Sequence, residues 1–130
     1  MKHFIENNLF KVGVKEMGCE LTSVYSKEKD FEYLWQGDES VWNGQSPILF
    51  PIVGRLIDDK YILDGEEYDM PKHGFARRKK WEFVSSDENK MIFRLCDDIE
   101  TRKIYPFSFE FLITFTLNEN KLSVKHEIKN

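Results

Sequence analysis

The chain has 130 residues, the length of one domain, and a domain of this size can bury roughly two thirds of its unfolded surface. Eleven Phe, five Tyr and three Trp, with 32% charged residues, are typical of a folded globular protein and exclude a disordered chain. The net charge of −4 argues against a nucleic-acid or membrane partner, because such binders need clustered positive charge.

The two cysteines and three histidines give no sign of a metal site. Cys19 and Cys96 lie far apart and match no ligand spacing, so no metal and no organic cofactor is expected. The first residues, MKHFIENNLF, lack the apolar segment of a secretory signal, and no apolar run approaches the ~20 residues that span a bilayer. We therefore predict a cytoplasmic protein with both thiols reduced.

The first half of the chain combines two predicted strands with an irregular segment. LFKVGVK at 9–15 and FEYLWQ at 31–36 are predicted strands, and His3 is predicted to lie in a mobile terminus. Residues 37–60 are interrupted by glycines and prolines (Gly37, Gly44, Pro47, Pro51 and Gly54). Irregular backbone on a rigid sheet is where binding sites tend to lie, so this segment is a candidate site.

The second half predicts three hairpins. Asp64–Gly65 is the first turn, because this pair tolerates the positive φ angles of a two-residue loop. KKWEFV at 79–84 and KMIFRL at 90–95 flank the polar loop SSDEN and predict the second. Residues 106–130 predict the third. No window has a convincing helical period, so the sequence predicts an all-β, antiparallel fold in one domain, 1–130.

The last hairpin has the clearest pattern in the chain. Its first strand places an apolar residue at every second position (Phe107, Phe109, Phe111, Ile113, Phe115 and Leu117), so one face is predicted to be core. Its second strand repeats the pattern through Leu122, Val124, His126 and Ile128. On this face, His126 is predicted to be a packed, hydrogen-bonded core histidine.

Two stretches remain that simple strands do not explain. NGQSPILFPIVGRL at 43–56 takes an apolar run into a lone arginine, Arg55, and MPKHGFARRKKWEF at 70–83 follows the Asp-Gly hairpin. The basic run at 77–80 is interpreted as the solvated start of a strand, with a contact to a phosphosugar as the alternative.

The order SPILFPIVGRL, a Tyr-bearing Asp-Gly hairpin, MPKHGFAR, a tryptophan and then YPFSFEFLITFTLNENKLSVKHEIKN resembles the aldose 1-epimerase (galactose mutarotase-like) family, in its bacterial branch with the His-Gly-Phe-Ala-Arg signature. The likeness runs from about residue 10 to the end of the sequence. It implies the N-terminal half of a large antiparallel β-sandwich. It also implies that the apolar run threads the core and delivers Arg55 into a sugar cleft, beside His73.

The chemistry of anomer exchange suits such residues. A proton must reach the ring oxygen while another leaves the anomeric hydroxyl, which imidazole and carboxylate groups can perform, and guanidinium donors can orient hydroxyls. The resemblance implies that His73 positions the substrate, and that Arg55, His73, Arg77 and Phe75 bind an aldose.

Each of these residues also has a purely structural interpretation. His73 could be a surface-turn histidine, Arg55 an edge residue that extends to solvent, and Arg77 a salt-bridge partner. Phe75, Trp81 and Trp42 are more often core than sugar platforms.

One departure from the family affects function. Relatives are about twice as long, and the resemblance implies that their acid histidine and base glutamate follow residue 130. We therefore expect only the sugar-binding half of an aldose 1-epimerase site, and either homo-oligomerisation or a missing C-terminal half that covers apolar sheet faces, with the contact near Phe109, Phe111 or Val124. A noncatalytic carbohydrate-binding module and a β-sandwich interaction domain are the alternatives.

Overall fold

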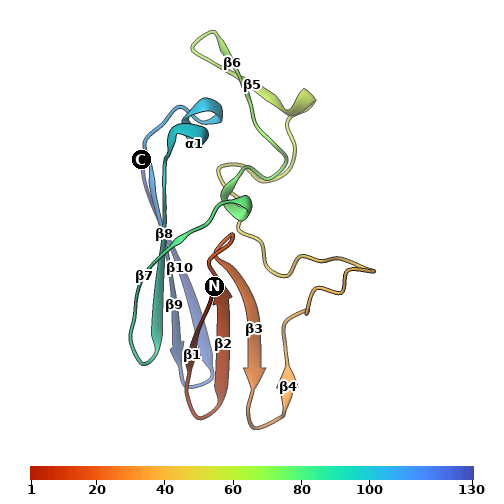
Figure 1. The fold of residues 1–130 in the computed structure, drawn as a ribbon, viewed down its shortest axis with the longest axis vertical. Helices are drawn as coiled ribbons and strands as arrows, with labels where there is room; N and C mark the ends of the chain where they lie inside the picture. The colour runs from red at the N-terminus through yellow and green to blue at the C-terminus, as the bar shows by residue number, and fades with distance from the viewer.

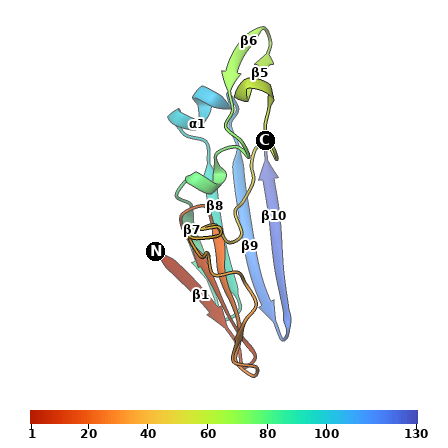
Figure 2. The same ribbon diagram turned by 90° about the vertical axis from the view of Figure 1, so that its right-hand side faces the viewer.

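The computed structural model describes residues 1–130 and is built from antiparallel sheets (Figure 1). One four-stranded sheet has the order β1 (Lys2–Glu6), β2 (Phe10–Lys15), β3 (Glu20–Ser26), β4 (Phe31–Glu32). The second has the order β10 (Lys121–Lys129), β9 (Glu110–Asn118), β8 (Lys90–Cys96), β7 (Glu82–Ser86). A separate hairpin, β5 (Lys60–Leu63) and β6 (Glu66–Asp69), projects at one end together with the helix α1 (Ile99–Ile104) (Figures 1 and 2).

Two short 3₁₀ turns, η1 (Ile57–Asp59) and η2 (Ala76–Arg78), complete the fold. None of the helices has both the length and the apolar character needed to cross a membrane.

The two large sheets share one hydrophobic core, as a sandwich requires. Inward residues of the first sheet, such as Val12 and Val14, belong to the same buried cluster as Phe93 of β8 and Ile113 of β9. Trp81 is also fully enclosed there and donates its indole N–H to the carbonyl of Ala76 at 3.0 Å. The predicted all-β, antiparallel sandwich is therefore confirmed.

The predicted hairpins are present. Asp64 and Gly65 both have positive φ, 51° and 85°, as a tight two-residue turn needs, and join β5 to β6. β7 pairs with β8, and β9 pairs with β10. Five of the six alternating residues of β9 and the segment before it are buried (Phe109, Phe111, Ile113, Phe115 and Leu117). Phe107, which precedes the strand, is more exposed and lies outside this row.

The sequence missed several elements and misjudged others. β1, β3 and α1 were not predicted, and β4 is only Phe31–Glu32 instead of 31–36. It ends early because the Glu32 carboxylate accepts the backbone N–H groups of Val24 at 2.7 Å and Leu34 at 2.9 Å, which takes over the role of ladder hydrogen bonds. His3 is not in a mobile terminus: it lies on β1, bonds Glu16 at 2.9 Å and stacks on Phe83.

The apolar run at 47–53 does not thread the core as predicted. Only Phe50 is buried in this run, and Val53 is 76% exposed. Ile48 and Ile52 are partly buried against the core. The deepest anchor is the Phe50 ring, packed among Phe75, Tyr105 and Phe109.

His126 corrects a second prediction. It lies on the expected face of β10, opposite Ile113, and its ring lies 5.8 Å from that of Phe111, but the side chain is exposed and makes no hydrogen bond. β10 is the edge strand of its sheet, and no element of this structure covers it; Ile128 on the same strand is 52% exposed (Figure 2). The predicted contact residues Phe109 and Phe111 are already buried within the chain, so association through the exposed residues of β10 stays a prediction.

The exposed setting of His126 predicts a small effect on stability. His126→Ala removes only the contact between the exposed imidazole and the Phe111 ring, whose centroids lie 5.8 Å apart, so we expect the free energy of unfolding to fall by no more than about 1 kcal/mol. Urea denaturation of the two proteins measures this difference. A loss above about 1.5 kcal/mol would show that the imidazole is packed after all.

Candidate functional site

Two segments that are far apart in sequence lie against each other at the site. The carbonyl of Phe50 accepts the backbone N–H groups of Phe75 at 2.9 Å and Ala76 at 3.2 Å. The carbonyl of Gly54, four residues after Phe50, accepts the backbone N–H of His73 at 2.8 Å. The segment that carries Arg55 therefore contacts the His73 turn. Neither Arg55 nor His73 lines the two cavities described below, so the sugar cleft that the resemblance implied stays a prediction.

Gly74 is what allows this approach. Its φ is 69°, and a Cβ atom at this position would lie only 2.1 Å from the carbonyl oxygen of Phe50. No residue with a side chain fits here, so the glycine of the His-Gly-Phe-Ala-Arg signature is explained by backbone contact.

The protonation of His73 follows from one hydrogen bond. The N–H of Gly54 donates to His73 Nδ1 at 2.8 Å, so Nδ1 is the acceptor and we assign the ring proton to Nε2. Partial burial lowers the pKa of His73, and the positive charges of Lys72 and Arg77 lower it further. His73 is therefore a neutral imidazole that offers one N–H donor at Nε2.

Arg55 is anchored from one side only. Its Nε and one Nη donate to the two carboxylate oxygens of Asp59 at 2.8 and 2.7 Å. This pair raises the pKa of Arg55 and lowers that of Asp59. The side chain is 65% exposed, so the pair adds little stability, but it fixes the direction of the guanidinium and leaves the other Nη free for a ligand.

The basic run divides into two kinds of residue. Lys79 pairs with Asp98 at 2.8 Å and Lys80 with Glu16 at 3.2 Å, so these two charges are used within the fold. Arg77 and Arg78 pair with no carboxylate. Arg77 donates one Nη to the carbonyl of Lys72 at 3.0 Å, whereas its Nε is buried without any partner. An unpaired buried donor costs about 1–3 kcal/mol, so this arginine is poorly explained as a structural residue.

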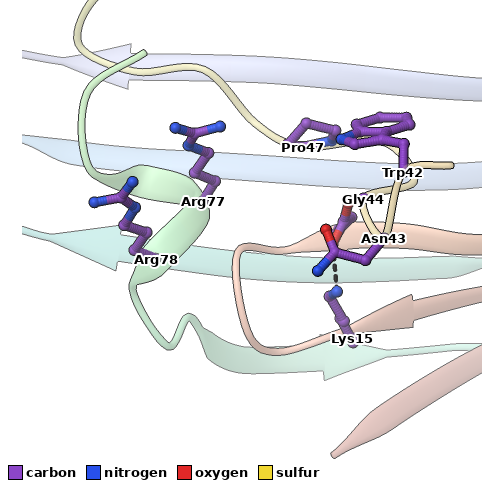
Figure 3. A pocket seen from close by; sticks show the side chains of 8 residues that line it. Lys15, Trp42, Asn43, Gly44, Pro47, Arg77 and Arg78 are labelled. Carbon is purple, nitrogen blue, oxygen red and sulfur yellow. Dashed lines mark ion pairs between the residues drawn. The ribbon is translucent and has the colours of Figure 1, made fainter. Parts of the chain in front are cut away.

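A cavity of about 380 Å³ lies beside these arginines (Figure 3). Arg77 and Arg78 of η2 approach it from one side, and Trp42 and Asn43 of the irregular segment approach from the other. Its full lining is Lys15, Glu20, Trp42, Asn43, Gly44, Pro47, Arg77 and Arg78.

The turn between β2 and β3 holds this cavity together. Gly18, with φ 74°, donates its N–H to the carbonyl of Lys79 at 2.8 Å, and a Cβ there would lie 2.7 Å from the carbonyl oxygen of Arg77. This contact brings Lys15 and Glu20 to η2, a placement that no local sequence signal revealed.

The Glu20 carboxylate is fully engaged. It is buried, pairs with Lys15, and accepts the backbone N–H groups of Gln45 at 2.8 Å and Ser46 at 2.9 Å. Burial alone would raise the pKa of Glu20, but these hydrogen bonds outweigh it and the pKa is lowered. Glu20 therefore anchors the loop at 45–46 and is not available as a base near neutral pH.

Two of the three aromatic candidates are core residues, and one is exposed. Phe75 is 5% exposed and packs edge-on against Phe50, so it is a core residue in this structure. Trp81 is core as well. Trp42 is 49% exposed and lines the cavity, so it is the one of the three whose ring can reach a ligand.

A second, apolar cavity of about 300 Å³ lies behind the same loop and is lined by Phe50, Pro51, Ile52, Leu56, Tyr61, Met70 and Tyr105. It offers almost no polar group. No cluster of three or more His, Cys, Asp or Glu side chains that could hold a metal is present.

Several known proteins resemble this chain in sequence and in fold. The chain is 35% identical over 132 residues to the plasmid protein LacX of Lactococcus lactis subsp. lactis, covering 97% of this chain and 44% of LacX. A galactose mutarotase related enzyme from Lactobacillus acidophilus superimposes with a TM-score of 0.96 at 41% identity, covering 98% of this chain and 43% of that one. A galactose mutarotase-like protein from Lactobacillus casei superimposes with a TM-score of 0.97 at 36% identity, covering 100% of this chain and 44% of that one.

The chain thus spans somewhat less than half the length of these relatives, as the resemblance to one half of such a protein predicted. The family model described as Aldose 1-epimerase matches residues 1–130. The match covers every residue of the chain, so the chain belongs to the aldose 1-epimerase family.

Proposed function

We propose that this chain supplies the sugar-binding part of an aldose 1-epimerase site, formed around Arg55, His73 and Arg77. Family membership supports an aldose as the ligand. The observation that carries the proposal is the Gly54–His73 bond, because it fixes the imidazole as a donor at Nε2 on the turn that contacts the residue before Arg55.

In this proposal the three residues hold the sugar and do not transfer protons. A neutral imidazole N–H and a guanidinium donate to ring or hydroxyl oxygens, and an arginine cannot give up its proton near neutral pH. Phe75 supports the turn from the core without touching the ligand. The acid and base would come from the part of the relatives beyond the matched region.

A noncatalytic carbohydrate-binding role is the second candidate. The observation that favours it is the state of the nearby carboxylates: Asp59 is held by Arg55, and Glu20 by Lys15 and two backbone donors. Neither has the raised pKa of a proton-transfer group.

A cytoplasmic location, and association through β10 with a second copy or a C-terminal half, remain predictions.

The experiment is a titration of the chain with galactose, followed by NMR chemical shifts. His73→Ala should weaken binding about tenfold, the effect of losing one hydrogen bond worth about 1.4 kcal/mol. His126→Ala is the matched control, because it is the same substitution at an exposed histidine on β10. Equal affinities for His73→Ala and the unaltered chain would remove His73 from the site.

A further inference from the structure

A third cavity, of about 360 Å³, lies at the end of the sandwich opposite the β5–β6 hairpin (Figure 1). Three turns meet there: the one between β1 and β2, the one between β3 and β4, and the one between β9 and β10. We call it the turn cavity. Its apolar wall is formed by Leu9, Phe10 and Tyr33, and its polar wall by Ser26, Glu28, Lys29 and Asn120.

Hydrogen bonds fix the three turns to one another. The Asn7 side chain donates to the carbonyl of Glu119 at 2.8 Å, which joins the β1–β2 turn of one sheet to the β9–β10 turn of the other. Its carbonyl oxygen accepts the N–H groups of Leu9 at 2.9 Å and Phe10 at 2.8 Å. The N–H of Lys27 in the β3–β4 turn donates to the carbonyl of Leu9 at 2.8 Å. The cavity is therefore already formed without a ligand, as most ligand sites are.

The apolar wall presents an aromatic ring to solvent. Tyr33 is 51% exposed, yet its ring is supported on two sides. Phe10, which packs against the core, lies 6.3 Å from it, and Phe31 meets it edge-on at 5.1 Å. An aromatic surface held in place and left in water favours a ligand with an apolar face.

The polar wall has unused hydrogen-bonding groups of both kinds. Glu28 and Asn120 are exposed, and neither side chain bonds another group of the chain. Lys29 places its Nζ 5.9 Å from the centre of the Tyr33 ring. A carboxylate only accepts, an ammonium only donates, and an amide does both. The one negative and one positive charge cancel, so the cavity does not favour a charged ligand over an uncharged one.

We propose that the turn cavity binds an uncharged pyranoside, which gives the chain a second carbohydrate site. A pyranose ring packs its C–H groups on an aromatic face, while its hydroxyls donate to the carboxylate of Glu28, accept from Lys29, and do both with the Asn120 amide. The volume is near the lower end of the ~300–1,000 Å³ typical of ligand sites. The inference does not rest on the proposed function, because Arg55 and His73 do not line this cavity.

The test is a titration of the chain with methyl β-galactoside, followed by NMR chemical shifts of the backbone amides. We expect shifts at Tyr33 and Asn120. Two comparison ligands separate the contributions: cyclohexanol has a six-membered ring with one hydroxyl, and glycerol has hydroxyls without a ring. Each should bind at this cavity at least about tenfold more weakly than the pyranoside. Cyclohexanol binding as tightly would show an apolar site, and glycerol binding as tightly a site for hydroxyls alone; either result would overturn the proposal.

Two variants test the two walls separately. Tyr33→Ala should weaken binding of methyl β-galactoside at the turn cavity by at least about tenfold, because it removes the apolar surface under the ring. Asn120→Ala keeps that surface and should weaken binding by about five- to tenfold, the effect of losing one hydrogen bond. If neither variant changes the affinity, the pyranoside is bound elsewhere and the proposal fails.

Phe4→Ala is the matched control for Tyr33→Ala. Phe4 is 49% exposed, nearly the same as Tyr33, but it lies on β1 and does not line the turn cavity. We expect its loss to leave the affinity unchanged. Equal weakening by Phe4→Ala and Tyr33→Ala would contradict the assignment, because any exposed aromatic ring would then serve.

The positions of the shifts separate this inference from the proposed function. In His73→Ala, the shifts at Tyr33 and Asn120 should persist with the same affinity. Shifts confined to the residues around His73 would mean that the second site does not exist and that the aldose site stands. Shifts confined to the turn cavity would mean the reverse.

Discussion

Replacing Gly74 with alanine is expected to destabilise the chain by at least about 3 kcal/mol, or to prevent its folding. A left-handed backbone costs an L-residue about 1 kcal/mol, and the new methyl group would also lie 2.1 Å from the carbonyl oxygen of Phe50. This oxygen already accepts two backbone hydrogen bonds that join the site segments, so it cannot move without breaking them. Urea denaturation measures the loss.

Gly65→Ala is the control that isolates the contact. Gly65 also has a positive φ, 85°, but a Cβ there would meet nothing within 4 Å. We therefore expect Gly65→Ala to lower the free energy of unfolding by only about 1 kcal/mol, the cost of a positive φ for a residue with a side chain. Equal losses at the two positions would mean that the 73–76 turn moves away from Phe50 easily and that the close approach does not organise the site.

The parts of the fold that the sequence predicted are those specified by local pattern. β9 alternates large apolar residues without interruption, and Asp64–Gly65 is a strong two-residue turn signal. β3 was missed because buried positions in it carry Glu20, Thr22 and Ser26, so no apolar period is visible. Glu20 and Thr22 find partners elsewhere in the chain, the N–H of Gln45 for Glu20 and the carbonyl of Gly13 for Thr22, whereas Ser26 accepts the N–H of nearby Lys29.

The helix α1 was missed for a different reason. Its six residues are too few to show a helical period. A capping signal was present, since Asp98 accepts the N–H of Thr101 and the Thr101 hydroxyl accepts the N–H of Asp98. His126 shows the opposite error: its face was predicted correctly, but burial depends on what covers β10, and strand period carries no information about that.

The resemblance predicted that Arg55 and His73 lie near each other, and backbone hydrogen bonds between 50–54 and 73–76 do bring their segments into contact. Their role in sugar binding stays a prediction. The cavity residues Lys15 and Glu20 were not predicted, because they reach η2 only through the packing of the Gly18 turn. Asn43 lies in the irregular segment 37–60 that was predicted as a candidate site, although the residue itself was not singled out. The basic run likewise could not be divided into paired and unpaired residues before the positions of Asp98 and Glu16 were known.

The last prediction concerns catalysis. We expect the 130-residue chain to interconvert aldose anomers at least about 100-fold more slowly than a full-length relative, because a positioned acid or base each contributes about 10²–10⁴-fold. None of its histidines is placed as an acid. The Nδ1 atom of His73 is occupied by the Gly54 N–H, His3 is bonded to Glu16 on β1, and His126 is on the exposed edge strand.

The carboxylates lead to the same expectation. A general base near neutral pH needs a raised pKa, whereas those of Asp59 and Glu20 are lowered by their hydrogen-bond partners. NMR exchange spectroscopy on galactose, or polarimetry, measures the rate, with the Lactobacillus acidophilus enzyme as the full-length reference. A rate comparable to the reference would contradict the assignment of His73 as a positioning residue. In that case His73→Ala should abolish the activity, because His73 would then have to transfer the proton itself.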